Sequence, residues 1–281
     1  MTFIIEHKTK YTYSNNVFLE PHVLRFKPAT TKFCNIKSFF INVLPEPAGL
    51  CEQTDIENNN NHICWFEGMQ NELTIQTRAI IEIANYNPFN FIIHPSSFYH
   101  LPLQYDDFEV PLLHSALQCE GISETMKQYT KDVIGKYSFE TTSFLFNITR
   151  LINEDFEVES RYEGPPLDPG KTFDLKTGSC RDLAWMQIQM LRNVGIAARF
   201  VSGYLFIEME EANYELHAWL EAYIPGAGWI GLDPSQGMVT GNNYFAVSQS
   251  SDYRNTMPVS GSIRGDADSK MEAQVFIEKI K

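Results

Sequence analysis

The hydrophobic periodicity changes twice along the chain, and this constrains the fold more than any other feature. From Thr2 to about Asn85, apolar and polar residues alternate as in half-buried strands, in the segments FIIEHKTKYTY, KSFFINVLPEP and NELTIQTRAIIEIAN. Helical spacing follows, clearest in TTSFLFNITRLINEDF, and alternation returns from Ala198 in RFVSGYLFI, ELHAWLEAYI and EAQVFIEKI. Strands, then helices, then strands predict an α+β fold.

A connector rich in proline and aromatic residues runs from Pro88 to Pro111, between the first strands and the helices. It divides the chain into two expected domains. Residues 1–95 are predicted to form a β-rich, sandwich-like domain. Residues 96–281 are predicted to form a second domain of helices packed on an antiparallel sheet, and we group the last strand segment with it.

The charge balance excludes several classes of partner. The 281 residues include 22 basic and 35 acidic side chains, for a net charge of −13, and no basic block could follow a phosphate backbone. The opening residues MTFIIEHKTKYTYS lack a signal-peptide pattern, and no run of about 18 apolar residues occurs. We therefore expect a cytoplasmic protein that binds neither nucleic acid nor membrane.

The five cysteines are widely spread and never form a C-x-x-C pair. A zinc site or a disulfide framework is therefore not expected, and no EF-hand pattern is present either. We infer no metal and no cofactor. Four of the cysteines resemble small core residues, whereas Cys180 differs from them in its setting.

Cys180 lies in the segment KTGSCRDLAWMQIQMLRNVG, which has the signals of a helix start and stop. Ser179 precedes Asp182 by three positions, as in a capping box, and Gly195 suits the end of the helix. A thiol in the first helical turn meets unpaired N–H groups and the positive end of the helix dipole, which lower its pKa. The alternative is a small residue tolerated in a tight turn.

His217 and Asp233 lie in ELHAWLEAYIPGAGWIGLDPSQG, two alternating strands around a Pro-Gly-Ala-Gly turn. His217 and Trp219 share the more polar face of the first strand. A loop of odd length, or a bulge, would place Asp233 opposite Trp219 and diagonal to His217, and we expect this register. A carboxylate beside an imidazole fixes its tautomer and stabilises its charged form. A lone strand histidine is otherwise usually structural.

The strings GSCRDLAWMQIQMLRNVGIAARFVSGYL and HAWLEAYIPGAGWIGLDPSQG resemble the core of the bacterial transglutaminase-like family, whose members are often described as candidate cysteine proteases. The opening strands resemble the β-rich region commonly fused to that core, and SSDYRNTMPVSGSIRG resembles the segment that usually follows it. The resemblance implies a papain-like core with a catalytic triad of Cys180, His217 and Asp233. Ser235 and Gln236 depart slightly from the family's usual residues and bear on substrate preference.

Neighbouring residues have two interpretations each. Asp182 could assist the site, although its capping position explains it, and Arg181 could bind a substrate carboxylate or pair with a nearby acid. Trp185 and Trp219 could wall an acyl pocket or belong to the core. The acidic stretch EMEEANYE, from Glu208 to Glu215, is predicted to be a solvated hairpin tip that would favour basic substrates if it overhangs the site.

The expected reaction is acyl transfer at an amide bond of a peptide or protein substrate through a thioester. Hydrolysis is favoured, because water is always present and no acceptor-binding signal stands out. Transfer to an amine, as in a transglutaminase, is one alternative. A non-catalytic binding module on the same fold is another.

Overall fold

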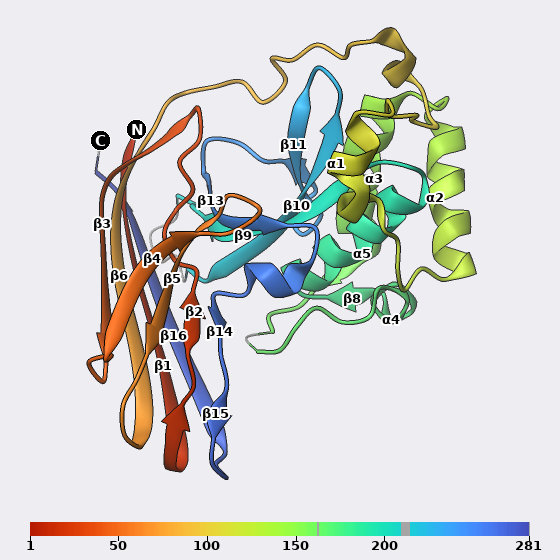
Figure 1. Ribbon diagram of the computed structural model, residues 1–281. Coiled ribbons are helices and arrows are strands. Elements are labelled where there is room, and N and C mark those ends of the chain that lie inside the picture. Colours follow the sequence, from red (N-terminus) through yellow and green to blue (C-terminus); the bar gives the residue numbers. More distant parts are fainter. Residues whose placement is uncertain (162, 209–213, 281) are drawn as a thin grey trace.

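The computed structural model describes the whole chain apart from residues 162, 209–213 and 281, and its elements follow the predicted order of strands, helices and strands (Figure 1). The N-terminal strands are β1 (Thr2–Leu19), β2 (His22–Leu24), β3 (Cys34–Leu44), β4 (Gly49–Thr54), β5 (Asn60–Trp65) and β6 (Gln70–Ile83). The helices are η1 (Ser96–Tyr99), α1 (Glu109–Leu117), α2 (Glu124–Lys136), α3 (Thr141–Asp155), α4 (Pro169–Leu175), α5 (Cys180–Asn193) and η2 (Tyr253–Thr256). The remaining strands are β7 (Glu157–Val158), β8 (Thr177–Gly178), β9 (Ala198–Leu205), β10 (Leu216–Ile224), β11 (Gly228–Asp233), β12 (Met238–Val239), β13 (Tyr244–Ser250), β14 (Val259–Ser260), β15 (Ile263–Arg264) and β16 (Ser269–Lys279).

The N-terminal strands form a β-sandwich. One sheet has the order β15-β1-β6-β3, with β16 also paired to β1, and the other has the order β14-β2-β5-β4. Alternate residues of both sheets, including Leu19, Leu24, Val43, Cys64 and Leu73, meet in one buried cluster. This two-sided packing is what the period-2 alternation of the sequence predicts.

The C-terminal strand β16, which was expected to belong to the second domain, pairs with β1 over its whole length, from Phe3 opposite Lys279 to Tyr13 opposite Ser269. The chain thus returns to the first sheet after building the second. The division between residues 95 and 96 stays a proposal, because strands from both sides of it share one sheet.

The second half is a five-stranded antiparallel sheet, β12-β11-β10-β9-β13, covered by helices. Helix α5 is buried almost all round and packs against β10 and β9 on one side and against other helices on the other. A helix that is buried on nearly all sides is expected only in the interior of a protein. The α+β prediction, with helices on an antiparallel sheet, is confirmed. No helix among the described residues has the length and apolar character needed to cross a bilayer.

The segment between β6 and α1 closes over the tip of the β10–β11 hairpin. His94 donates its backbone N–H to Pro225 O at 3.2 Å. Gly226 has a φ of 83°, and a Cβ there would lie 2.5 Å from Ile92 O. The turn therefore needs glycine both for its backbone angle and for this close approach.

Candidate active site

Cys180 is the first residue of α5. The preceding Ser179 has extended backbone angles, and the Asp182 carboxylate accepts hydrogen bonds from Ser179 N at 2.8 Å and from Ser179 Oγ at 2.6 Å. Gly178 makes room for this contact, because a Cβ there would lie 2.9 Å from Asp182 Cβ. The predicted capping pair is confirmed. Cys180 consequently lies where the helix N-terminus favours an anion.

His217 on β10 donates a hydrogen bond from Nε2 to Asp233 Oδ2 at 2.6 Å. The Asp233 side chain is fully buried. Its Oδ2 also accepts from the Tyr244 hydroxyl at 2.9 Å, and its Oδ1 accepts from Ser235 N at 2.9 Å and Ser235 Oγ at 2.7 Å. These donors fix the carboxylate in place. Nδ1 is then the ring nitrogen of His217 left for another partner.

The hairpin register brings the histidine and the carboxylate together. Pairing of β10 with β11 runs from Leu220 opposite Leu232 to Ile224 opposite Gly228, which leaves a three-residue loop. This is the odd-length register predicted from the sequence. Asp233, the next residue after this ladder, consequently falls on the face that carries the imidazole.

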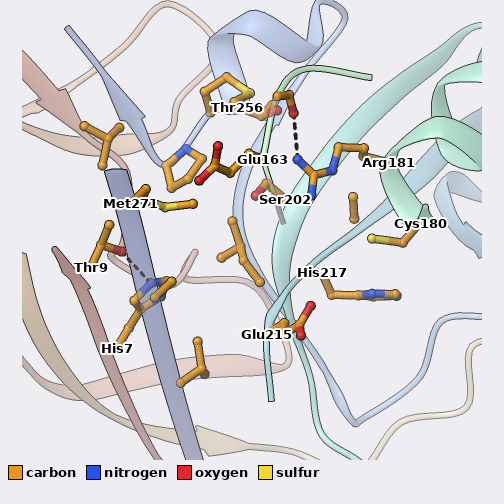
Figure 2. Close-up of a pocket in the computed structure, with 18 of the residues that line it drawn as sticks. His7, Thr9, Glu163, Cys180, Arg181, Ser202, Glu215, His217, Thr256 and Met271 are labelled. Atoms are coloured by element: carbon orange, nitrogen blue, oxygen red, sulfur yellow. Dashed lines mark hydrogen bonds between the residues drawn. The ribbon is translucent and has the colours of Figure 1, made fainter. Parts of the chain in front are cut away.

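The thiol, the imidazole and the carboxylate influence one another's ionisation, and Figure 2 shows the Cys180 sulfur beside the His217 ring. Burial raises the pKa of Cys180, but His217, the backbone of Ala218 and the charge of Arg181 together lower it below its usual value. Burial lowers the pKa of His217, yet Asp233 and Cys180 raise it above its usual range. Burial raises the pKa of Asp233, but its hydrogen bonds lower the pKa by more, so it lies below the usual value. The directions of these three shifts all favour the ionised forms, thiolate, imidazolium and carboxylate.

Cys180 and His217 open into a cavity of about 680 Å³, which we call the Cys180 cavity (Figure 2). Its opposite wall is the face of β1 and β16, which contributes His7, Thr9 and Met271. The loop at residues 163–166, the segment Thr256–Val259 and residues of β9 and β10 also line it. The cavity thus lies between the N-terminal sheet and the second half of the chain, so both halves shape it.

Arg181 and Asp182 tie the loop before α4 to the start of α5. Asp182 Oδ1 accepts from Arg161 Nη2 at 2.5 Å and from Leu167 N at 2.7 Å. Arg181 donates to the carbonyl oxygens of Gly164, at 2.6 Å, and Arg161. The Arg181 guanidinium therefore binds backbone oxygens rather than an acidic side chain. Both residues position one wall of the Cys180 cavity.

The two candidate tryptophans belong to the core. Trp185 packs against Tyr253, with ring centroids 5.0 Å apart. Trp219 packs against Tyr244 at 5.3 Å and lies 6.2 Å from the His217 ring. Neither indole lines the Cys180 cavity. The core interpretation therefore holds for both, and Trp219 in addition supports the ring of His217.

The acidic stretch can be placed only in part. Glu210 and Glu211 lie outside the described residues. Glu215 lines the Cys180 cavity, and Glu163 faces it from the loop before α4 (Figure 2). A third acidic residue of the lining, Glu272 on β16, forms an ion pair with Lys270.

Sequence reasoning missed Tyr244 and the cavity-lining part of the segment after β13. Tyr244 was an ordinary strand residue in the sequence, since nothing local links it to Asp233, eleven positions earlier. The segment that contains Met257 and Pro258 was noted only for its resemblance to a family region. Its Pro-containing, non-alternating character is the one local signal that it is a loop near the site.

Two parts of the chain match protein families. Residues 3–82 match the bacterial transglutaminase-like N-terminal region, and residues 127–234 match the transglutaminase-like superfamily. The second match spans Cys180, His217 and Asp233.

Comparisons with single proteins agree with these matches. An uncharacterized protein of Mycobacterium tuberculosis is 22% identical over 285 residues, covering 95% of this chain and 89% of that protein. The protein-glutamine gamma-glutamyltransferase of Pseudomonas aeruginosa is 36% identical over 70 residues, covering 22% of this chain and 10% of that protein. The crystal structure of a candidate cysteine protease from Cytophaga hutchinsonii superposes with a TM-score of 0.75 at 20% identity, covering 100% of this chain and 92% of that one. At that identity the likeness establishes the fold alone.

Proposed function

The chain carries a bacterial transglutaminase-like N-terminal region followed by a transglutaminase-like core, and we propose that it is an enzyme that cleaves amide bonds of peptides through a cysteine thioester. The observation that carries the proposal is the largely buried 2.6 Å hydrogen bond from His217 to Asp233 beside a thiol of lowered pKa. Keeping an imidazolium and a carboxylate out of water costs free energy. A binding module without catalysis has no use for that arrangement.

In the first half-reaction the Cys180 thiolate attacks the carbonyl carbon of the amide, and the carbonyl oxygen becomes an oxyanion. The backbone N–H of Cys180 at the start of α5 is our candidate oxyanion donor, and such a donor contributes about 3 to 4 kcal/mol in comparable sites. The C–N bond then breaks as His217 gives its proton to the leaving amine. Asp233 keeps the imidazole in the tautomer that this transfer requires.

In the second half-reaction water loses a proton to His217 and attacks the thioester, which releases the carboxylic acid and restores the thiolate. We favour hydrolysis because the Cys180 cavity, at about 680 Å³, is large enough for water to reach the thioester. Transfer to an amine is the second candidate. The segment shared with the Pseudomonas gamma-glutamyltransferase supports it.

A peptide library incubated with the protein and a labelled primary amine tests both candidates, with mass spectrometry scoring cleavage and amine incorporation. We expect cleavage to dominate, and Cys180→Ser to abolish it because a hydroxyl is far harder to deprotonate. Cys51→Ser is the matched control, since Cys51 is an exposed free thiol outside the Cys180 cavity. Loss of activity in both variants, or in neither, would contradict the proposal.

A further inference from the structure

Strand β16 presents to the Cys180 cavity a stretch of backbone edge, at Met271 and Ala273, that pairs with no strand among the described residues. At the two ends of its ladder with β1, Asp268 O accepts from Ser14 N and Ile280 N donates to Thr2 O, both at 2.9 Å. Backbone groups of successive strand residues point to opposite sides. Even-numbered residues of β16 therefore bond to β1, whereas the N–H and C=O groups of Met271 and Ala273 point away from it.

A single antiparallel β-bridge places this edge relative to the strand that carries His217. Val275 of β16 pairs antiparallel with Tyr214, and β10 begins two residues after Tyr214. From this bridge β16 and β10 diverge, and Met271 and Ala273 line the Cys180 cavity that opens between them. Figure 2 shows Met271 on one side of the cavity and Cys180 with His217 on the other. Among the residues that the structure describes, none hydrogen-bonds to the backbone of Met271 or Ala273.

We propose that the substrate binds as an added β-strand: an extended polypeptide segment pairs with Met271 and Ala273 on the β16 edge, and this holds its amide carbonyl against Cys180. An open strand edge is a template for an extended chain, and its main-chain hydrogen bonds give affinity without demanding one sequence. The inference rests on the proposed function. It gives the N-terminal sheet, through its C-terminal strand, a direct part in substrate binding.

The charges around the edge point to a substrate segment with lysine or arginine. Three glutamates line the cavity: Glu272 is paired with Lys270, whereas Glu163 and Glu215 form no ion pair with another described residue. Arg181 is the one guanidinium among the described residues of the lining; it is hydrogen-bonded to the carbonyl oxygens of Gly164 and Arg161 and attracts Glu215 only at longer range. Two carboxylates without an ion pair therefore face one guanidinium, and a basic side chain beside the paired peptide would balance the remaining negative charge.

The test measures the alkylation rate of Cys180 by mass spectrometry with three reagents: iodoacetamide, the chloromethyl ketone of acetyl-alanine, and a lysine-containing pentapeptide chloromethyl ketone. Ala273→Pro removes the outward N–H, and proline is tolerated on an edge strand where its N–H faces away from the ladder. We expect this variant to lower the ratio of the pentapeptide rate to the iodoacetamide rate about tenfold, the effect of losing one or two hydrogen bonds.

Lys279→Pro is the matched control, because it removes an outward N–H of the same strand outside the Cys180 cavity. We expect it to keep the ratio of the native chain. Should Ala273→Pro fail to fold, pentapeptide reagents N-methylated at alternate nitrogens can be tested on the native chain. Only the reagents methylated at the nitrogens that face β16 should then label Cys180 no faster than the acetyl-alanine reagent does. Replacing the lysines with glutamates should also slow labelling, most at low salt.

The outcomes separate this inference from the proposed function. If iodoacetamide modifies Cys180 no faster than the other cysteines, the proposed function fails. If Cys180 is fast but the pentapeptide gains nothing over acetyl-alanine, or if a folded Ala273→Pro labels like the native chain, peptide pairing on β16 is overturned and the enzyme proposal stands.

Discussion

Asp182 and Asp233 are two buried carboxylates of the same site, and they differ in the basic side chain with which each is paired. Their side chains are 1% and 0% exposed, and each accepts several hydrogen bonds. Burial raises the pKa of each carboxyl, but the hydrogen bonds lower it by more than burial raises it, so both pKa values lie below the usual one. Asp182 pairs with Arg161, which is always charged, whereas Asp233 pairs with His217, which can lose its proton.

The difference teaches that a depressed carboxyl pKa does not by itself mark a catalytic group. A carboxylate beside a guanidinium can only hold structure, because its partner neither gives nor takes a proton. A carboxylate beside an imidazole sets the tautomer and proton affinity of a base. We therefore expect changes at Asp233 to act on reactivity and changes at Asp182 to act on stability.

The largest expected effect is that of Asp233→Asn on turnover. In serine proteases, replacing the aspartate of the triad with asparagine lowers turnover about 10⁴-fold, because the amide favours the wrong imidazole tautomer. We expect a change in the same direction here. Turnover of a peptide from the library measures it, with circular dichroism to show that the fold persists. Near-full turnover with a native spectrum would reduce the triad to a Cys180–His217 dyad.

Asp182→Asn should instead destabilise the fold by about 3 kcal/mol in urea denaturation, because it leaves Arg161 without its buried partner. The pKa of Asp182 is lower in the folded chain than the unfolded value of 3.8, so its ionised carboxylate stabilises the fold above that pH. This stabilisation disappears as the pH falls through the folded pKa. The difference between the native chain and the variant should therefore shrink on acidification. Glu154→Gln, which breaks the exposed pair with Arg150, should have a much smaller effect, because solvent screens that pair. Equal losses in both variants would contradict a structural role specific to Asp182.

His217→Ala should raise the pH midpoint of Cys180 labelling, because the imidazole that favours the thiolate is lost. The native thiol should be labelled below the free-thiol value of about 8.5, because His217 favours thiolate. Without the imidazole, burial remains as the largest influence and raises the pKa. Trp185→Phe should leave the midpoint in place. A native midpoint at or above 8.5 would show that the thiol is not activated.

The smallest expected effect is that of Tyr244→Phe, which removes one of the donors to Asp233 Oδ2. We expect turnover to fall about tenfold or less, since His217 and Ser235 still bond to the carboxylate. Tyr223→Phe is the control, because the Tyr223 hydroxyl contacts Glu109, which does not line the Cys180 cavity. Identical behaviour of the two variants would exclude a positioning role for Tyr244.

Features that depend on neighbours close in sequence could be predicted. The capping contact of Ser179 with Asp182 spans three residues, and the hairpin register depends on one short loop, so hydrogen-bond geometry and side-chain alternation determine both. The placement of Cys180 at a helix start and of Asp233 beside His217 follows from these local rules.

Features that depend on segments far apart in the sequence could not be predicted. Tyr244 reaches Asp233 only because β13 lies across β9 from β10, and β16 closes the first sheet against residues near the other end of the chain. The sequence by itself determined which residues are candidates for catalysis and which face of each element carries them, because periodicity and capping are local. Only the tertiary structure decided what surrounds them, including the β16 edge across the Cys180 cavity, because packing between distant segments depends on the whole core rather than on any one stretch of sequence.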